Sequence, residues 1–355
     1  MKVLIVSFGD VSNPTNGYLM RVSYIYTCLS KVTNVGTIQF VTDENERKTD
    51  VSVYIKIKNS YLSLLTTITT KSLTLLPLIK SYDIVMIEGS IFLPFGIVAK
   101  VLRKKLVYDT HGSTVELAKG LKGIRNFIFR LLIGGLLDRL STFISDLVIA
   151  ISESDMEIFK KYTRNKEKIV VVRHAVDVSK IPFYKINNEK VRTAIFVGNL
   201  NSIQNYEAVK NLIKIARYLP SVKFLVVGDG KERFSNYPEN MIFVGKVASL
   251  DEYYISADAC VVPLTSGTGV KTKVLECMAY GRPVITTRKG VEGLVGVEKL
   301  DGVIVQDDVM KFPEILKNLQ LKREYRQLRE YVEENYSVKI LCKQLLEALG
   351  KTFNK

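Results

Sequence analysis

The segment SGTGVKTKVLECMAYGRPVITT, residues 266–287, begins with glycine or lysine at every second position: Gly267, Gly269, Lys271 and Lys273. Gly267 and Gly269 leave backbone N–H groups unshielded and tolerate positive φ, as a loop that surrounds a phosphate requires. Lys271 and Lys273 add positive charge beside that loop. This combination is typical of a binding site for a phosphate or diphosphate group.

The spacing of apolar residues after Val270 predicts a helix, so the glycine loop precedes a helix N-terminus. Free amides and the helix dipole favour an anion at such a position. The strand-like run CVVPL precedes the loop, and ligands of open α/β sheets bind at strand carboxyl ends. Glu276 lies further along the helix, where a carboxylate can accept two adjacent sugar hydroxyls. The segment predicts a nucleotide-diphosphate site; the alternative is a glycine turn before a surface helix with solvated charges.

The composition is that of a folded, basic protein. The chain has 355 residues, of which 47% are hydrophobic and 25% are charged, and this length favours two domains of about 150 residues each. The net charge of +15 favours an anionic partner such as a nucleotide, a phospholipid surface or nucleic acid. A lysine-rich solvated surface gives the same excess, and the composition leaves both interpretations open.

The four cysteines and two histidines disfavour a zinc site, because no C-x-x-C pair occurs. We expect Cys28, Cys260, Cys277 and Cys342 to be reduced core residues of an intracellular protein. No uncharged apolar run approaches the ~18–20 residues that a membrane span requires. A cytoplasmic location follows as an expectation, with peripheral membrane contact left open.

Short β-rich runs alternate with helical patterns along the whole chain, which predicts parallel sheets with crossover helices. We expect six strands in the first half, in KVLIVSF, VGTIQFVT, YDIVMIEG, KKLVYDTHG, DLVIAIS and KIVVVRHAV. Six more are expected in RTAIFVGN, VKFLVVGDG, MIFVGKV, ACVVPLT, RPVITT and GVIVQD. The GDG after the second of these indicates a turn, because a dinucleotide fingerprint needs a third glycine. The strand pattern is interrupted at residues 177–192, where we therefore expect the boundary between the two domains.

The segment SGTGVKTKVLECMAYGRPVITTRKGVEGL resembles the donor motif of retaining GT-B glycosyltransferases of the family 4 type. NPTNGYLMRVSYIYTCLSK, YDTHG, SDLVIAISESDMEIFKKY, AIFVGNLNSIQNYEAVKNLI and FLVVGDGKE follow the family's order. The resemblance implies two doubly wound, Rossmann-like parallel-sheet domains that face a cleft. It places the acceptor domain at 1–180, the donor domain at 190–336, and a helix crossing back to the first domain at 337–355.

By the same resemblance, the protein transfers a sugar from a UDP- or GDP-sugar to an acceptor hydroxyl with retention of configuration. No cofactor, metal or specific nucleic acid is implied, and no D-x-D pattern ends a strand. The expected donor-binding residues are Asn16, Gly17, Gly198, Asn199, Asn205, Thr268, Gly269, Val270, Lys271, Lys273 and Glu276.

Two departures from the family pattern concern the donor site. Thr268 occupies a position where the family typically has a glutamate that contacts the donor sugar, which leaves the identity of the sugar open. Asn199 and Asn205 lie near positions where many members carry cations, so Lys271 and Lys273 are the expected substitutes. A catalytically weakened nucleotide-sugar-binding or scaffold protein is the alternative, and a GT-B epimerase is disfavoured by the scarcity of histidine.

On the acceptor side, His111 in YDTHG is expected to line the cleft near the reacting sugar and, with Lys271 and Lys273, to contribute to catalysis. His174 is expected to be structural, and Ser152 to cap a helix whose first turn is acidic. The basic apolar stretch 117–143 fits either a buried domain helix or a helix on an anionic membrane. The acceptor itself stays open between a glycan, a lipid-linked sugar and a protein.

Overall fold

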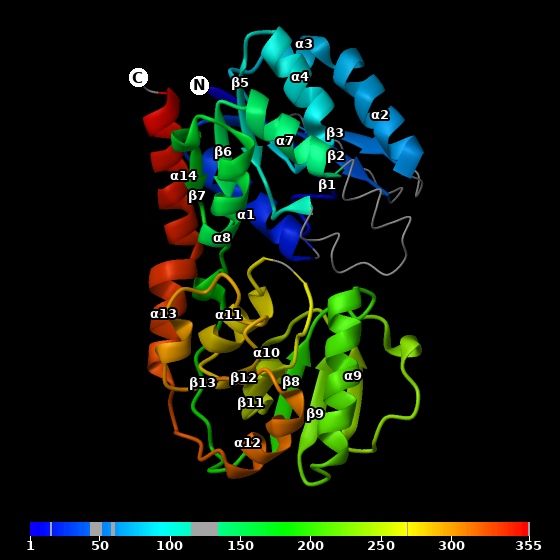
Figure 1. Ribbon diagram of the computed structural model, residues 1–355, viewed down its shortest axis with the longest axis vertical. Coiled ribbons are helices and arrows are strands. Elements are labelled where there is room, and N and C mark those ends of the chain that lie inside the picture. Colours follow the sequence, from blue (N-terminus) through cyan, green and yellow to red (C-terminus); the bar gives the residue numbers. More distant parts are fainter. Residues whose placement is uncertain (15, 43–51, 58–60, 115–133, 268, 354–355) are drawn as a thin grey trace. The chain divides into compact units, whose positions relative to one another are not determined.

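The computed structural model describes residues 1–14, 16–42, 52–57, 61–114, 134–267 and 269–353 (Figure 1). The chain divides into two compact units: Met1–Ala175 together with Lys339–Lys355, and Val176–Val338. Each unit contains one sheet in which all paired strands are parallel. The prediction of two Rossmann-like parallel-sheet domains is confirmed.

The sheet of the first unit has the strand order β3-β2-β1-β4-β5-β6-β7. Its strands are β1 Lys2–Phe8, β2 Asn34–Val41, β3 Ser52–Lys56, β4 Ile84–Glu88, β5 Lys105–Asp109, β6 Leu147–Ala150 and β7 Ile169–Val171. The central strands are continuous apolar runs because helices cover both faces of the sheet. The edge strand β3 was missed by the sequence interpretation, since its half-buried SVYIK lacks such a run.

The helices of the first unit are α1 Gly17–Ser30, α2 Tyr61–Thr74, α3 Leu76–Lys80, α4 Leu93–Val101, α7 Gly135–Ile144, α8 Glu153–Phe159 and α14 Val338–Phe353. Helices α2, α3, α4 and α7 pack against one another on one side of the sheet, and α1 and α14 lie on the other (Figure 1). Ser152 caps α8 as predicted, accepting a hydrogen bond from the amide of Asp155. In α14, Gln344 accepts a hydrogen bond of 3.0 Å from the amide of Arg173.

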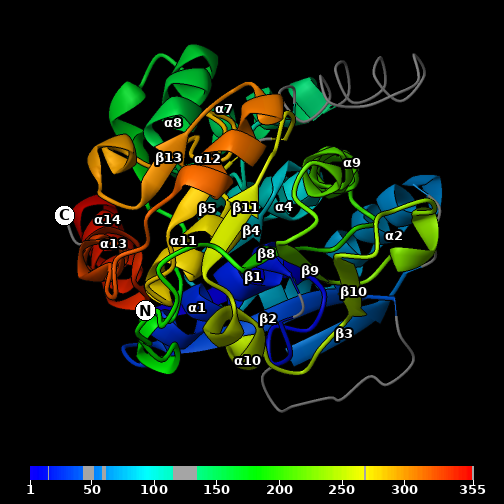
Figure 2. The ribbon, with the colours of Figure 1, turned by 90° about the horizontal axis from the view of Figure 1, so that it is seen from below.

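The sheet of the second unit has the order β10-β9-β8-β11-β12-β13. Its strands are β8 Thr193–Val197, β9 Lys223–Val227, β10 Met241–Gly245, β11 Ala259–Val262, β12 Val284–Thr286 and β13 Val303–Val305. Its helices are α9 Ile203–Arg217, α10 Asp251–Ser256, α11 Thr272–Ala279, α12 Phe312–Asn318 and α13 Arg326–Tyr336. Figure 2 shows α9 and α12 on one face of this sheet and α10 and α11 on the other. The segment 177–192, predicted as the boundary, lies inside this unit.

The expectation of reduced cysteines is wrong. A disulfide joins Cys28 of α1 to Cys342 of α14, and a second joins Cys260 of β11 to Cys277 of α11. The partners of the first bridge are 314 residues apart in the sequence and meet only because α14 packs beside α1. The expectation of an intracellular protein rested on reduced cysteines, and the two disulfides remove that argument.

Among the helices of the described residues, none has both the length and the apolar character that crossing a bilayer demands.

Candidate functional site

The glycine loop of the second unit has the backbone that its sequence predicts. Gly267 has a φ of +105° and Gly269 a φ of +70°, a region that side chains other than glycine rarely adopt. Helix α11 begins three residues later at Thr272, and no side chain caps its first turn. The amide of Val274 already donates to the carbonyl oxygen of Lys271, which leaves the amides of Thr272 and Lys273 available to an anion. The side chain of Val270 packs against the core and anchors the loop.

Lys271 lies at the N-cap position of α11 and has only 4% of its side chain exposed. Its ammonium donates a hydrogen bond of 2.6 Å to the carbonyl oxygen of Gly269 and lies 4.0 Å from a carboxylate oxygen of Glu292. The side chain thus folds back onto the glycine loop and places positive charge beside its backbone.

Lys273 is held against the end of strand β8. Its Nζ donates to the side-chain oxygen of Asn205 and lies 4.5 Å from the ring centroid of Phe196. Asn205 in turn donates a hydrogen bond of 2.8 Å to the carbonyl oxygen of Asn199. A Cβ at Gly198 would lie 2.7 Å from Nδ2 of Asn205 and 2.8 Å from Nζ of Lys273, so a side chain at this position would push both of these groups aside. Burial, the largest cause, lowers the pKa of Lys273 to about 7 because the charged form is poorly solvated there.

Glu276 lies one turn further along α11 and is half-buried. Its carboxylate accepts a hydrogen bond of 3.4 Å from the hydroxyl of Tyr254, whose ring stacks on that of Tyr280. Burial raises the pKa of the Glu276 carboxyl, while Tyr254 and Lys273 oppose the rise. Thr268, the remaining expected residue of this segment, lies outside the described residues.

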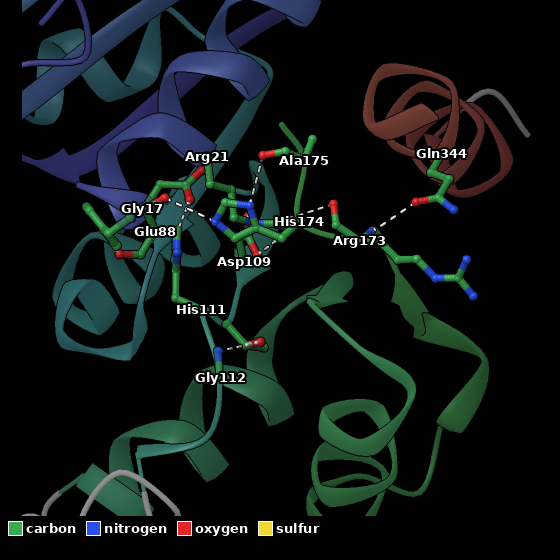
Figure 3. A network of polar contacts seen from close by, with 12 residues as sticks. Gly17, Arg21, Glu88, Asp109, His111, Gly112, Arg173, His174, Ala175 and Gln344 are labelled. Carbon is green, nitrogen blue, oxygen red and sulfur yellow. Dashed lines mark hydrogen bonds and ion pairs between the residues drawn. The ribbon is translucent and has the colours of Figure 1, made fainter. Parts of the chain in front are cut away.

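In the first unit, His111 belongs to a polar cluster at the carboxyl ends of β4 and β5 (Figure 3). Its Nε2 lies 2.6 Å from a carboxylate oxygen of Glu88. Asp109, paired with Glu88 in the strand register, accepts hydrogen bonds of 2.8 and 3.1 Å from Arg21 of α1. Burial, and then the neighbouring Asp109, raise the pKa of Glu88. The ring of Tyr18 lies 4.3 Å from that of His111, centroid to centroid.

Glu88, Asp109 and His111 offer one donor atom each within 4.8 Å of one another. Both oxygens of Asp109, however, already accept hydrogen bonds from the Arg21 guanidinium. The positive charge of the guanidinium, 2.8 and 3.1 Å from these oxygens, would repel a metal cation bound there. The cluster is therefore better suited to hydrogen bonding than to metal binding.

The other expected residues of the first unit take part in local structure. Asn16 caps α1, since its side-chain oxygen accepts a hydrogen bond of 3.0 Å from the amide of Leu19. The carbonyl oxygen of Gly17, the first residue of α1, lies 3.1 Å from Nε2 of His174. His174 is buried, and burial lowers its pKa to about 4, so its imidazole is neutral at pH 7.

The sequence interpretation missed three residues of these clusters: Glu88, which contacts His111; Tyr254, which contacts Glu276; and Arg21, which pairs with Asp109. Glu88 ends the otherwise apolar strand IVMIE, and a carboxylate at a strand end is a signal that could have been used. Nothing local indicates that Arg21 pairs with Asp109, because they are 88 residues apart.

Residues 191–320 match the family model of glycosyl transferases group 1. No curated protein sequence matched the chain. Among solved structures, the chain is similar to sucrose-phosphate synthase from Thermosynechococcus elongatus, with a TM-score of 0.78 and 16% identity over 99% of both chains. The chain has the GT-B fold. The resemblance to GT-B glycosyltransferases of the family 4 type is confirmed.

Two further GT-B structures are similar over the whole chain. HepE from Anabaena, solved in complex with UDP and glucose, has a TM-score of 0.73 and 15% identity over 99% of this chain and 100% of its own. WaaG, a glycosyltransferase involved in lipopolysaccharide biosynthesis, has a TM-score of 0.72 and 15% identity over 100% of both chains. At these identities the likeness establishes the fold alone.

Proposed function

We propose that this protein is a glycosyltransferase that moves a sugar from a nucleoside-diphosphate sugar to an acceptor hydroxyl, with retention of configuration and without a metal ion. The observation that carries the proposal is the arrangement around the start of α11. Gly267 and Gly269 expose backbone amides through positive φ, and Lys271 and Lys273 place two cations beside them. Such a set of donors suits a diphosphate.

In the proposed donor site, Lys271, Lys273 and the amides of α11 contact the diphosphate, and Glu276 accepts hydrogen bonds from the ribose. Gly198 and Asn199 line the site because Asn205 joins them to Lys273. The HepE structure holds UDP and glucose, which favours UDP over GDP as the donor nucleotide.

The proposed reaction is a front-face displacement. The bond from the sugar's anomeric carbon to the phosphate oxygen breaks, and a bond to the acceptor oxygen forms on the same face. The acceptor proton passes to the departing phosphate, so no protein general base is assigned. Negative charge grows on the diphosphate as its bond breaks, and nearby cations and amides stabilise that charge. His111 is proposed to contact the reacting sugar.

The activity is tested by incubating the protein with UDP-, GDP-, ADP- and dTDP-sugars and measuring thermal stabilisation and release of free sugar. A donor at about 100 times its dissociation constant adds roughly 2.7 kcal/mol to the free energy of unfolding. We expect UDP-sugars to stabilise most, and sugar release to continue in EDTA with the anomeric configuration retained. Stabilisation without any turnover would favour the scaffold alternative, and loss of turnover in EDTA would refute metal independence.

Substitution of Glu276 tests the ribose contact. In Glu276→Ala, two donor hydroxyls lose a charged acceptor, so we expect UDP binding to weaken by roughly 1.5–3 kcal/mol. Isothermal titration calorimetry with UDP measures the loss, and Glu252→Ala on the exposed side of α10 is the matched control. Unchanged affinity in Glu276→Ala would exclude this residue from the site.

We also propose that the first unit contacts an anionic membrane, as a lipid-linked acceptor would require. Helix α7 exposes Leu136, Leu140 and Phe143 on one face. Phe143 also lines a cavity of about 640 Å³ together with Lys161, Tyr162, Thr163, Arg164, Asn165 and Lys168. Apolar side chains beside cations suit an anionic lipid surface.

The membrane contact is tested by co-sedimentation with vesicles. Binding to phosphatidylglycerol vesicles, lost in Phe143→Glu and absent with phosphatidylcholine, supports it. Equal sedimentation of the wild type and Phe143→Glu with phosphatidylglycerol vesicles would contradict the membrane contact. Residues 117–133 of the basic apolar stretch 117–143 lie outside the described residues.

A further inference from the structure

His111 is held in one orientation by its backbone conformation and by two side-chain contacts. Its backbone has a φ of +51°, in the left-handed region. Its Nε2 lies 2.6 Å from the Glu88 carboxylate, and the Tyr18 ring packs at 4.3 Å. Tyr18 is itself fixed, because its hydroxyl donates to the Glu88 carbonyl oxygen at 3.0 Å and accepts from the amide of Phe8 at 3.2 Å. The direction in which the imidazole presents its second nitrogen is therefore set by the fold.

The Glu88 carboxylate depends on His111 for a hydrogen-bond partner. Asp109 is compensated, since it receives both hydrogen bonds from Arg21 and both side chains are fully buried. Glu88 is only 1% exposed, and its Oε1 has no hydrogen-bond partner within the described part of the chain. A buried carboxylate requires a partner, and among the described residues the Glu88 carboxylate has the imidazole of His111.

We propose that Glu88 is the positioning residue of His111: its carboxylate accepts the Nε2–H, which leaves Nδ1 to accept a hydrogen bond from a sugar hydroxyl. The proposal rests on the proposed function, in which His111 contacts the reacting sugar. A carboxylate that binds one imidazole nitrogen decides the tautomer, and with it the chemistry of the other nitrogen. Nδ1 has no hydrogen-bond partner among the described residues, and 14% of the His111 side chain is exposed.

The surrounding groups do not compete with Glu88 for His111. Arg21 from α1 and Asp109 from β5 neutralise each other. Tyr18 from α1 stays protonated, because burial raises its pKa well above the usual value. His174, which follows β7, faces backbone carbonyl oxygens with both nitrogens and is neutral at pH 7.

Substitution Glu88→Gln tests the proposal while keeping the shape of the side chain. An amide offers Nε2 either a carbonyl or an NH₂ group, so the imidazole loses its single enforced tautomer. The chain has only two histidines, so ¹⁵N spectra of labelled imidazoles resolve both, and His111→Gln assigns them. In the wild type we expect the neutral His111 to carry its proton on Nε2, and in Glu88→Gln we expect a mixture of tautomers.

The kinetic readout accompanies the spectra. Loss of the group that orients a metal-ligating histidine typically costs about 10- to 100-fold in activity, and we expect kcat of Glu88→Gln to fall by a similar factor. The donor KM should change little, because the diphosphate and ribose contacts are in the second unit. Glu153→Gln, which removes the pair with Arg173 on the surface of the same unit, is the control for general effects of losing a carboxylate.

The outcomes separate this inference from the proposed function. A wild-type proton on Nδ1, or identical tautomers in the two proteins, would overturn the role of Glu88 even if the enzyme is active. A tautomer shift without any turnover in the wild type would leave the Glu88–His111 pair established and refute the transferase activity. A tautomer shift with unchanged kcat would show that the pair is structural only, and would also overturn the proposal.

Discussion

Replacing both Lys271 and Lys273 with alanine should abolish most of the transferase activity. Charge on the leaving diphosphate increases as the glycosidic bond breaks, so these ammonium groups bind the transition state more tightly than the bound donor. Removal of one such preorganised donor typically lowers kcat by about 10²–10³-fold. We expect each single variant to lose that much, and the double variant more, with a smaller rise in donor KM.

Initial rates over a range of donor concentrations measure both parameters. Lys214→Ala, which removes an exposed lysine from the last turn of α9, controls for a general loss of positive charge. Wild-type turnover and donor affinity in the double variant would show that the two lysines are solvated surface residues.

Lys273 should also make donor binding depend on pH. Its pKa of about 7, lowered mainly by burial, rises when a diphosphate is bound nearby, since an anion favours the charged ammonium. Affinity for the donor is therefore full below pH 7 and decreases as the pH rises above 7, by at most about tenfold per unit. The neighbouring charges, Glu276 and Lys271, remain in place in Lys273→Met. This variant should bind the donor more weakly, and its affinity should not depend on pH in this way.

Titration calorimetry with UDP-glucose between pH 6 and 9 measures the effect, because the diphosphate of an intact nucleotide sugar does not itself titrate there. The same slope in wild type and Lys273→Met would assign the dependence to another group.

Replacing Arg21 with methionine should strongly destabilise the first unit. Arg21 and Asp109 are both fully buried, and removing the guanidinium leaves an unpaired charge in the core. Breaking a buried ion pair in this way typically costs about 3–5 kcal/mol, and we expect a loss of that size in the free energy of unfolding in urea. The double variant Arg21→Met, Asp109→Asn should recover part of it, since it contains no unpaired charge.

Arg164→Met, at an exposed position after α8, is the matched control and should change stability little. A loss below about 1 kcal/mol in Arg21→Met, or no recovery in the double variant, would mean that water or another cation compensates Asp109.

The amino-acid sequence alone is enough to predict the fold class and the contiguous part of the proposed donor site. Apolar runs such as KVLIVSF and FLVV, alternating with amphipathic helices, leave few arrangements other than parallel sheets with crossover helices. Gly267, Gly269, Lys271, Lys273 and Glu276 occupy one loop and the helix after it. Their proximity is local, so spacing alone could predict it.

The distant residues that meet these groups become apparent only in the folded chain. Asn205 reaches Lys273 from another helix, and Glu88 reaches His111 because β4 and β5 are neighbours in the sheet. The disulfide between Cys28 and Cys342 depends on the packing of the last helix against the first. Such contacts depend on strand order and helix packing, which residue spacing does not encode, because parallel sheets bring together side chains from segments far apart in the chain.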